Sequence, residues 1–159
     1  MKQGLLILLS LLLAAVAWAD QPNFQLTELR WKHRILLVFT PHDALPSYQR
    51  QRAEWERAKD GMKERDLLWI TLSPGQAASA AGRAISPASQ QQLRRDFGVK
   101  PGEFVVILVG LDGGTKLRAM EPVGADSLFA LIDSMPMRQN ELQRDKSRAQ
   151  ARPNSAPTQ

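Results

Sequence analysis

The stretch that most constrains the fold is a short apolar segment followed at once by a polar loop. Residues Arg34 to Thr40 (RILLVFT) are too few to cross a membrane and are rich in branched side chains, a composition typical of a strand buried on both faces. The loop Pro41 to Pro46 (PHDALP) follows and leads into an amphipathic helix. In α/β folds, ligands bind at loops that follow the carboxyl ends of central strands. We therefore expect the chain to be organised around this strand and its loop.

The first residues have the pattern of an export signal. A positive start at Lys2 precedes an apolar run from Leu5 to Ala17, and Ala17-Trp-Ala19 has the small-x-small form of a cleavage site. The run is shorter than the ~20 apolar residues that a spanning helix needs, so an uncleaved membrane anchor is the weaker alternative. We expect residues 1–19 to be a signal peptide, with no transmembrane segment left after its cleavage.

The composition excludes several classes of chemistry. The chain has 159 residues, a formal net charge of +5 and no cysteine, which rules out disulfides, thiol nucleophiles and cysteine-ligated metal sites. Export of a small cysteine-free domain indicates a bacterial periplasm, with secretion as the alternative. The basic residues are scattered, and nucleic acid is not an expected partner in that compartment.

Apolar periodicity predicts a β-α-β unit at the start of the domain. A helix over Pro46–Glu64 follows the first loop, and one face of it carries the apolar residues Leu45, Tyr48, Trp55, Ala58 and Met62. Arg52 falls within the same stripe. A second apolar strand covers Asp66–Leu72, and a right-handed crossover would make it parallel to the first.

Helix and turn signals continue through the middle of the chain. The small and polar residues of Ser73–Gly82 predict a mobile loop. Ser86 is a natural N-cap, Pro87 suits the first turn of a helix, and Gly98 is a natural stop. We expect a second helix between them.

The last part of the domain has a strand pair and a helix. Phe104–Val109 predicts another buried strand, and Asp112–Gly114 is a hairpin signal. The strand Thr115–Met120 alternates charged and apolar residues, as edge strands do. A helix over Asp126–Met135 is ended or kinked by Pro136.

The composition changes after the last predicted helix. From Arg138 onward apolar residues are few, and a helical extension to about Arg144 is the most that the pattern predicts. We expect one folded domain over residues 20–142. Residues 143–159 are predicted to be a disordered basic tail, because they offer too little apolar surface to offset the entropy of ordering.

Several segments together resemble a known protein family. They are LRWKHRILLVF (29–39), DLLWI (66–70), FGV (97–99) and LIDSMPMR (131–138), and the resemblance extends from about Leu26 to Leu142. The chain resembles a peroxiredoxin-like, thioredoxin-like family of unknown function, found in exported bacterial proteins and in vertebrate sushi-repeat and matrix proteins. The resemblance implies an α/β, thioredoxin-like β-α-β-α-β-β-α fold with a central mixed four-stranded sheet flanked by helices. It implies no established activity.

The resemblance also locates the position where related enzymes do their chemistry. Thioredoxin-like oxidoreductases carry reactive cysteines after the first strand, and the corresponding stretch here, Thr40 to Ser47, has no sulfur. Without a thiolate the chain cannot exchange disulfides or reduce peroxide by itself. The candidate ligand-binding residues of this loop are Thr40, His42 and Asp43, with Arg52 as an additional cation that could reach them.

Each of these residues also has a structural interpretation. His42 and Asp43 are either a proton-transfer or ligand-holding pair or an exposed turn capped by Asp43, which is the commoner case. Arg52 is expected to lie along the edge of the core with its head in water. His33 is the only other histidine, and two histidines without cysteine give no spacing that indicates a metal site, so we predict neither metal nor cofactor.

Two further segments are singled out by the resemblance and by residue type. Pro101 precedes the strand Phe104–Val109. Thioredoxin-like proteins carry a cis-proline before this strand, and we take Pro101 as a candidate cis-proline. Met135, Met137 and Arg138 surround Pro136 and are either a helix stop with gap-filling methionines or a docking segment anchored by the arginine.

The sequence favours a non-catalytic module that binds a protein or peptide partner in the cell envelope. The alternative is a non-thiol enzyme or anion-binding protein that uses the His42-Asp43 loop. A third interpretation, an envelope-stability protein without a discrete ligand, cannot be separated from the first by sequence.

Overall fold

The computed structural model describes residues 24–151, and the predicted signal peptide lies outside them. The chain enters through a short 3-10 helix, η1 (Leu26–Leu29). The strands are β1 (Arg34–Phe39), β2 (Leu67–Leu72), β3 (Ala78–Ala80), β4 (Arg83–Ile85), β5 (Val105–Val109) and β6 (Thr115–Ala119). The helices are α2 (Pro46–Arg57), α3 (Lys59–Glu64), α4 (Pro87–Asp96), α5 (Ala125–Asp133) and α6 (Pro136–Gln150).

Four strands form one mixed sheet in the order β2-β1-β5-β6. Strand β1 is parallel to β2 and antiparallel to β5, and β5 is antiparallel to β6. The predicted arrangement is confirmed: the most apolar strands are central and the charged strand β6 is at an edge. Every residue of β1 and β5 is buried, because both faces of these strands are covered.

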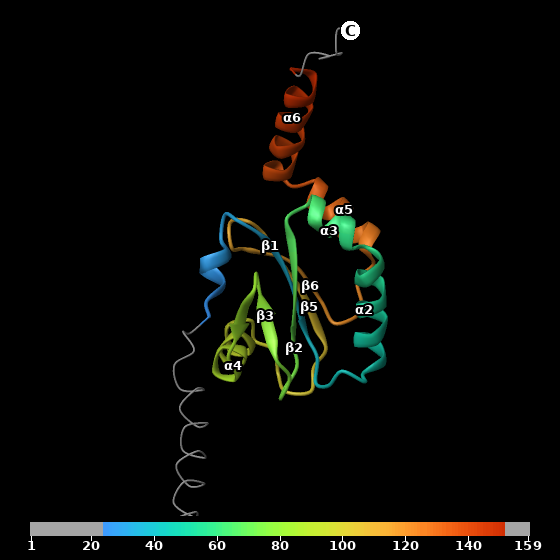
Figure 1. Ribbon diagram of the computed structural model, residues 1–159. Helices are drawn as coiled ribbons and strands as arrows, with labels where there is room; N and C mark the ends of the chain where they lie inside the picture. The colour runs from blue at the N-terminus through green and yellow to red at the C-terminus, as the bar shows by residue number, and fades with distance from the viewer. Residues whose placement is uncertain (1–23, 152–159) are drawn as a thin grey trace, which may run out of the picture.

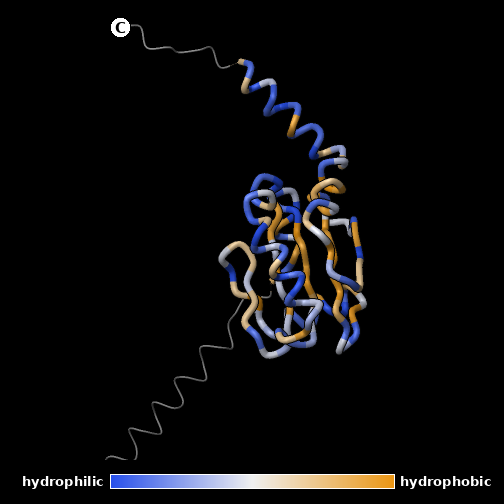
Figure 2. The backbone as a smooth tube through the Cα atoms, turned by 90° about the vertical axis from the view of Figure 1, so that its right-hand side faces the viewer, coloured by the Kyte–Doolittle hydropathy of each residue, from blue (hydrophilic) through white to orange (hydrophobic). Residues whose placement is uncertain are grey.

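The sheet separates two apolar cores. Alternate residues of β1 point to opposite sides, so Ile35, Leu37 and Phe39 pack against η1, α4 and the β3–β4 hairpin. Leu36 and Val38 pack on the other side against α2, α3 and α5, where Trp55 and Leu128 are fully buried. Figure 1 shows α4 and α2 on opposite sides of the sheet, and Figure 2 shows the hydrophobic strands between the more polar outer layers.

The predicted helix over residues 46–64 is divided in two. Its apolar face is as predicted, but α2 ends at Arg57 and α3 begins at Lys59, with Ala58 between them in a non-helical conformation. The buried residue in the middle of α2 is Gln51, whereas Arg52 is exposed. Gln51 is held by two hydrogen bonds to the backbone of Val123, 2.9 Å from its Nε2 to the carbonyl and 2.7 Å from the amide to its Oε1. An amide can be buried here because the loop before α5 satisfies both of its ends.

The predicted mobile loop is partly a hairpin, and that prediction is corrected. Strands β3 and β4 pair antiparallel around Ala81 and Gly82, which have positive φ of 48° and 79°. Positive φ at both central residues is the conformation that two-residue hairpins favour. Small residues have low strand propensity, which is why the sequence predicts a loop, but Ala80 and Ile85 are buried in the core and stabilise the hairpin.

The predicted disorder after residue 142 is also corrected. Helix α6 continues to Gln150 and projects from the body of the molecule (Figures 1 and 2). It is anchored through the ion pairs of Arg138 and Glu141, Leu142 is half-buried, and residues 143–151 are exposed. Straight-chain Gln, Arg, Lys and Glu residues favour helix even without an apolar face. The rest of the predicted tail, residues 152–159, lies outside the described residues. Over residues 24–151 no helix has both the length and the apolar character that crossing a bilayer requires.

Candidate functional site

The carboxyl ends of β1 and β2 meet at one edge of the sheet because the two strands are parallel. Thr40, directly after β1, is fully buried, and its amide donates to the carbonyl of Leu72 at 3.2 Å. Its Oγ1 donates to the carbonyl of His42 at 2.8 Å. The start of the predicted ligand loop is therefore fixed by hydrogen bonds within the protein.

The two titratable residues of the loop do not form a pair. His42 is exposed and Asp43 is half-buried. Within residues 24–151 neither side chain has a hydrogen-bond or ion-pair partner, and the contact made by Asp43 is through its carbonyl, which accepts from Nε2 of Gln49. A general base must be held by a second group, and His42 lacks that support here.

The cation at this edge is Arg94 of α4, which the sequence analysis did not single out. Its Nη2 donates to the carbonyls of Thr40 at 3.0 Å and Leu72 at 2.8 Å, and its guanidinium carbon lies 5.4 Å from the centroid of the Phe39 ring. Burial lowers the pKa of Arg94. Arg52, by contrast, is exposed. The pKa of Glu56 is lowered mainly by its hydrogen bond with Lys59, and the charge of Arg52 lowers it further.

A second polar group lies buried at the same edge. Ser73 follows β2 directly, is 2% exposed, and its Oγ has no hydrogen-bond partner within the described part of the chain. An unsatisfied buried hydroxyl is costly and calls for an explanation. The sequence gives one signal for Arg94, its position beside the apolar Leu93 in α4. A charged residue at such a position is usually part of the exposed helix surface, so the signal does not indicate a site.

Pro101 does not have the predicted geometry. No peptide bond within residues 24–151 is cis, so the bond before Pro101 is trans and the cis-proline hypothesis is wrong. Pro101 is exposed in a turn, with Gly102 at a φ of 84° beside it. The turn leads through Phe104 into β5, so three residues separate Pro101 from the strand and it does not occupy the place of a strand-preceding proline.

The opposite end of the sheet contains a network of ion pairs. Arg138 is 4% exposed and contacts Glu64 at 2.9 Å, Glu141 at 3.2 Å and Asp133 at 3.3 Å. Two further arginines complete the network. Arg34 pairs with Glu141 at 2.9 Å, and Arg65 pairs with Asp133 at 2.6 Å and stacks 4.4 Å from the Phe129 ring.

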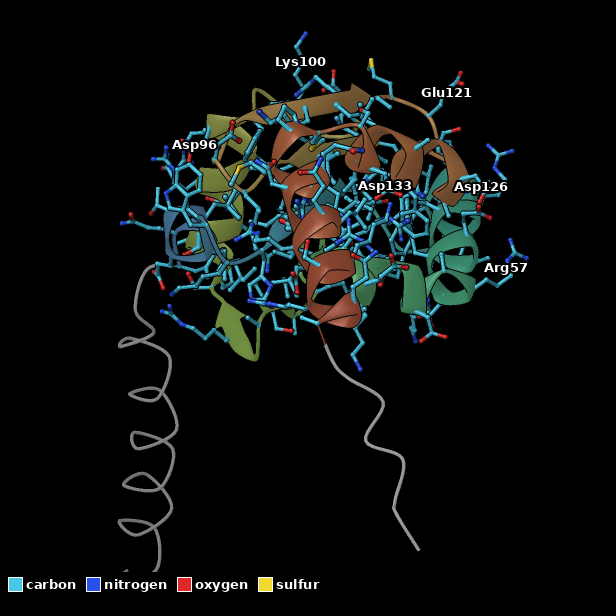
Figure 3. The ribbon with its side chains drawn as sticks, turned by 90° about the horizontal axis from the view of Figure 1, so that it is seen from above. Arg57, Asp96, Lys100, Glu121, Asp126 and Asp133 are labelled. Atoms are coloured by element: carbon cyan, nitrogen blue, oxygen red, sulfur yellow. The ribbon has the colours of Figure 1, made fainter. Side chains whose placement is uncertain are left out.

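This network shifts the pKa values of its members. Burial acts to raise the pKa of Asp133 and Glu141, but hydrogen bonds and charges from Arg65, Arg34 and Arg138 outweigh it and hold both pKa values below their usual range. Burial acts to lower the pKa of Arg138, and the carboxylates of Glu141 and Asp133 outweigh that effect and raise it. Figure 3 shows Asp133 next to the base of α6, where the network joins α5 to α6.

The network decides between the two interpretations of the Met-Pro-Met-Arg segment at Arg138. All of the guanidinium nitrogens of Arg138 face carboxylates of the same chain, so the residue is a structural anchor of α6 and is not available to a partner. Met135 occupies the N-cap position of α6 without a side-chain capping bond and packs on the core. Of the two methionines, Met137 is the exposed one, at 39%.

A metal site needs several nitrogen or oxygen ligands gathered in one place. Over residues 24–151 no group of three or more histidine, aspartate or glutamate side chains is placed to hold a metal ion. The carboxyl-end site offers a partly buried guanidinium, a buried hydroxyl and an exposed imidazole. Such a set can bind an anion or contact a partner, but nothing in it can act as a thiol nucleophile.

The residues from 25 to 141 match the family described as a domain of unknown function, DUF4174. The chain belongs to this family. DUF4174 covers η1 through the start of α6, and so contains the whole sheet, the ion-pair network and, except for Phe24, both cores.

This DUF4174 chain matches only a part of each of the following two relatives. It is 26% identical over 136 residues to coiled-coil domain-containing protein 80 of Danio rerio, covering 76% of this chain and 16% of that protein. It is 29% identical over 114 residues to the sushi repeat-containing protein SRPX of Homo sapiens, covering 70% of this chain and 25% of that protein. The chain therefore spans a quarter or less of each of these two proteins.

A solved structure shows the same fold. The reduced 2-Cys peroxiredoxin of Plasmodium vivax superposes with a TM-score of 0.54 at 15% sequence identity, covering 74% of this chain and 84% of that chain. The thioredoxin-like fold predicted for this DUF4174 domain is confirmed. At this identity the likeness concerns the fold alone, and the peroxidase chemistry depends on cysteines that this chain lacks.

Proposed function

We propose that this DUF4174 chain is an exported, non-catalytic thioredoxin-like module that binds a protein or peptide partner in the cell envelope. One observation carries the proposal: the loop that would hold the reactive cysteine has no sulfur, and its titratable residues have no supporting partners among residues 24–151. A catalytic constellation needs oriented groups, whereas a binding surface needs only exposed ones.

A cross-linked pull-down from native envelope extract tests this proposal. Three forms are compared: the full chain, a chain ending at Leu142, and the full chain with His42→Ala. The truncation removes only residues that are exposed in the structure or lie outside it, so the folded body is expected to persist. We expect the same discrete partner with all three forms, which places the interface on the body of the domain.

Two outcomes would contradict the proposal, and a third would contradict the expected position of the interface. Robust turnover by the purified full chain that falls by 10²–10⁴-fold with His42→Ala would identify a general acid–base catalyst instead. If none of the three forms retains a discrete partner, the proposal that the chain is a binding module is wrong. Loss of the partner with the truncated form alone would move the interface to residues 143–159.

A second candidate function is anion binding at the carboxyl end of β1 and β2. The observation that favours it is the guanidinium of Arg94, fixed on the carbonyls of Thr40 and Leu72, next to Ser73, whose buried hydroxyl has no hydrogen-bond partner within residues 24–151. Titration with inorganic phosphate, followed by the amide signals of Thr40 and Ser73, tests it. Binding should be lost with Arg94→Gln and retained with Arg95→Gln, because Arg95 is the exposed neighbour on the same helix.

A further inference from the structure

A cavity of about 660 Å³ lies against the core that contains Ile35 and Leu93, and none of the predicted loop-site residues lines it. It is bounded by η1, α4 and the turn 110–114 of the β5–β6 hairpin. Its floor is apolar and consists of side chains from the first core: Leu26, Ile35, Leu93, Phe97 and Val109. The cavity is in the size range of sites that enclose drug-sized ligands.

The wall formed by η1 is fixed in place. The amide of Phe24 donates to Oγ of Ser89 at 3.1 Å, which joins the entry of the chain to α4. On the other side, the amide of Trp31 donates to the carbonyl of Leu111 at 2.8 Å, which joins η1 to the hairpin turn. The cavity is therefore held open between three elements that are far apart in the sequence.

Two residues of opposite charge, Asp96 and Arg30, line this cavity. Asp96 accepts a hydrogen bond from Nε2 of Gln92 at 2.6 Å, which is a neutral donor. Arg30 stacks on the Trp31 ring with its guanidinium carbon 5.0 Å from the centroid. Within residues 24–151 neither charge has an ion-pair partner, whereas Asp112 on the same rim is neutralised by Lys116 at 2.7 Å.

One further feature belongs to the lining of this cavity, and another lies beside it. His33 lines it, and its buried Nδ1 has no hydrogen-bond partner in the described part of the chain. Trp31 stands outside the lining, beside the lining residue Arg30; it is 59% exposed and has a φ of 65°. Left-handed backbone is strained for an aromatic residue and is kept where the surrounding structure imposes it, commonly at ligand sites. An exposed tryptophan is also a common anchor at interfaces.

From these observations we propose that the cavity binds a short peptide with apolar side chains and free termini. The apolar side chains occupy the floor, the terminal ammonium lies at Asp96, and the terminal carboxylate lies at Arg30. A short free peptide carries an ammonium group at one end and a carboxylate at the other, with apolar side chains between them. The inference rests on the proposed binding function and deepens it, because it names the chemistry and the place of the ligand.

The tripeptide Leu-Phe-Leu and its capped forms test the charge assignment. Binding is followed by the fluorescence of Trp31, with a Trp31→Phe chain to identify its signal. We expect saturable binding of the free tripeptide, weakened by up to about fivefold by N-acetylation and by a similar factor by C-amidation, as for exposed ion pairs. Asp96→Asn should remove the effect of acetylation alone, and Arg30→Gln should remove the effect of amidation alone.

Asp126→Asn is the matched control for the acidic residue. Figure 3 shows Asp96 and Asp126 on opposite sides of the molecule, and Asp126 is exposed on α5. The variant should bind all three peptides as the unchanged chain does. If Asp126→Asn changes the preference as much as Asp96→Asn does, the charge effect is nonspecific and the assignment is wrong.

A second pair of variants tests the cavity itself. Gln92 lines it and Gln91 does not, although both are exposed and adjacent on α4. Gln92→Trp should reduce peptide binding by tenfold or more, and Gln91→Trp should leave it unchanged. If Gln92→Trp unfolds the chain, Thr27→Trp obstructs the cavity from the η1 side instead. Equal binding by the obstructed and control variants would overturn the inference.

Failure of the inference can be separated from failure of the proposed function. If the pull-down partner is retained by a chain with Gln92→Trp while no tripeptide binds to the unchanged chain, the module binds its partner elsewhere and only this inference is wrong. If neither partner nor tripeptide binds, the proposed function is wrong as well.

Discussion

The two ends of the sheet differ in how their charged groups are used. At the amino ends of β1 and β2, the three arginines and three carboxylates of the ion-pair network contact one another and link β1 to α6. At the carboxyl ends, His42 and Asp43 have no such contacts within residues 24–151, and only Arg94 is fixed. The difference shows that residue type alone is a poor guide to function in this chain, because its most conspicuous charge cluster stabilises the fold.

Removal of Arg138 should have the largest effect on stability. Arg138→Met leaves Asp133 and Glu141 with one cation fewer in a partly buried place, and breaking a buried ion pair costs 3–5 kcal/mol. Because these carboxylates are partly exposed, we expect the free energy of unfolding to fall by about 2–3 kcal/mol in chemical denaturation. Arg144→Met, on the exposed part of α6, should change it by less than about 0.5 kcal/mol. If both variants lower the free energy of unfolding equally, Arg138 does not anchor α6 more than the exposed Arg144 does.

Acid should weaken the same end of the molecule. The pKa values of Asp133 and Glu141 are lower in the folded chain than their usual values, so the unfolded chain takes up protons first as pH falls. The stabilisation is complete above the unfolded-state pKa of about 4 and is lost as pH falls through the folded-state values. Denaturation measured between pH 7 and pH 2.5 should show this loss. The slope should be smaller in Arg138→Met, and an unchanged slope would contradict the network's role.

Arg94 should have an intermediate effect at the carboxyl end. Arg94→Gln removes charged hydrogen bonds to the carbonyls of Thr40 and Leu72, and such bonds contribute about 1.5–3 kcal/mol when buried. Arg94 is half-buried, so we expect a loss of about 1 kcal/mol in the free energy of unfolding. Arg95→Gln should cost less than about 0.5 kcal/mol. A loss as large as that of Arg138→Met would mean that both ends of the sheet are structural.

His42 should have the smallest effect on stability. His42→Ala removes an exposed imidazole without partners in the described structure, and the free energy of unfolding should change by less than about 0.5 kcal/mol. Thr40→Val serves as the contrast at the same loop, because it deletes the bond to the His42 carbonyl and should cost about 1 kcal/mol. A large loss with His42→Ala would show that the loop is fixed by a contact absent from this structure.

The sequence by itself determined the sheet and most of its covering. Apolar runs identified β1, β2 and β5, the alternation of charge identified β6 as an edge strand, and the pair Ser86-Pro87 located the start of α4, where Oγ of Ser86 accepts from the amide of Ser89. These features depend on local propensity and on periodicity, which a sequence records directly. The missing cysteine excluded thiol chemistry in the same direct way.

Only the tertiary structure decided which charged and polar residues act together. Arg34 and Glu141 are 107 positions apart, Gln51 and Val123 are 72 apart, and Arg94 meets the carbonyl of Thr40 across 54. No local pattern specifies such pairs, because they form only when packing brings distant elements to one place. A sequence shows directly only neighbours along the chain, which is why the sequence analysis selected the adjacent residues His42 and Asp43. The structure added Arg94, the network around Arg138, and a cavity whose walls come from three separate segments.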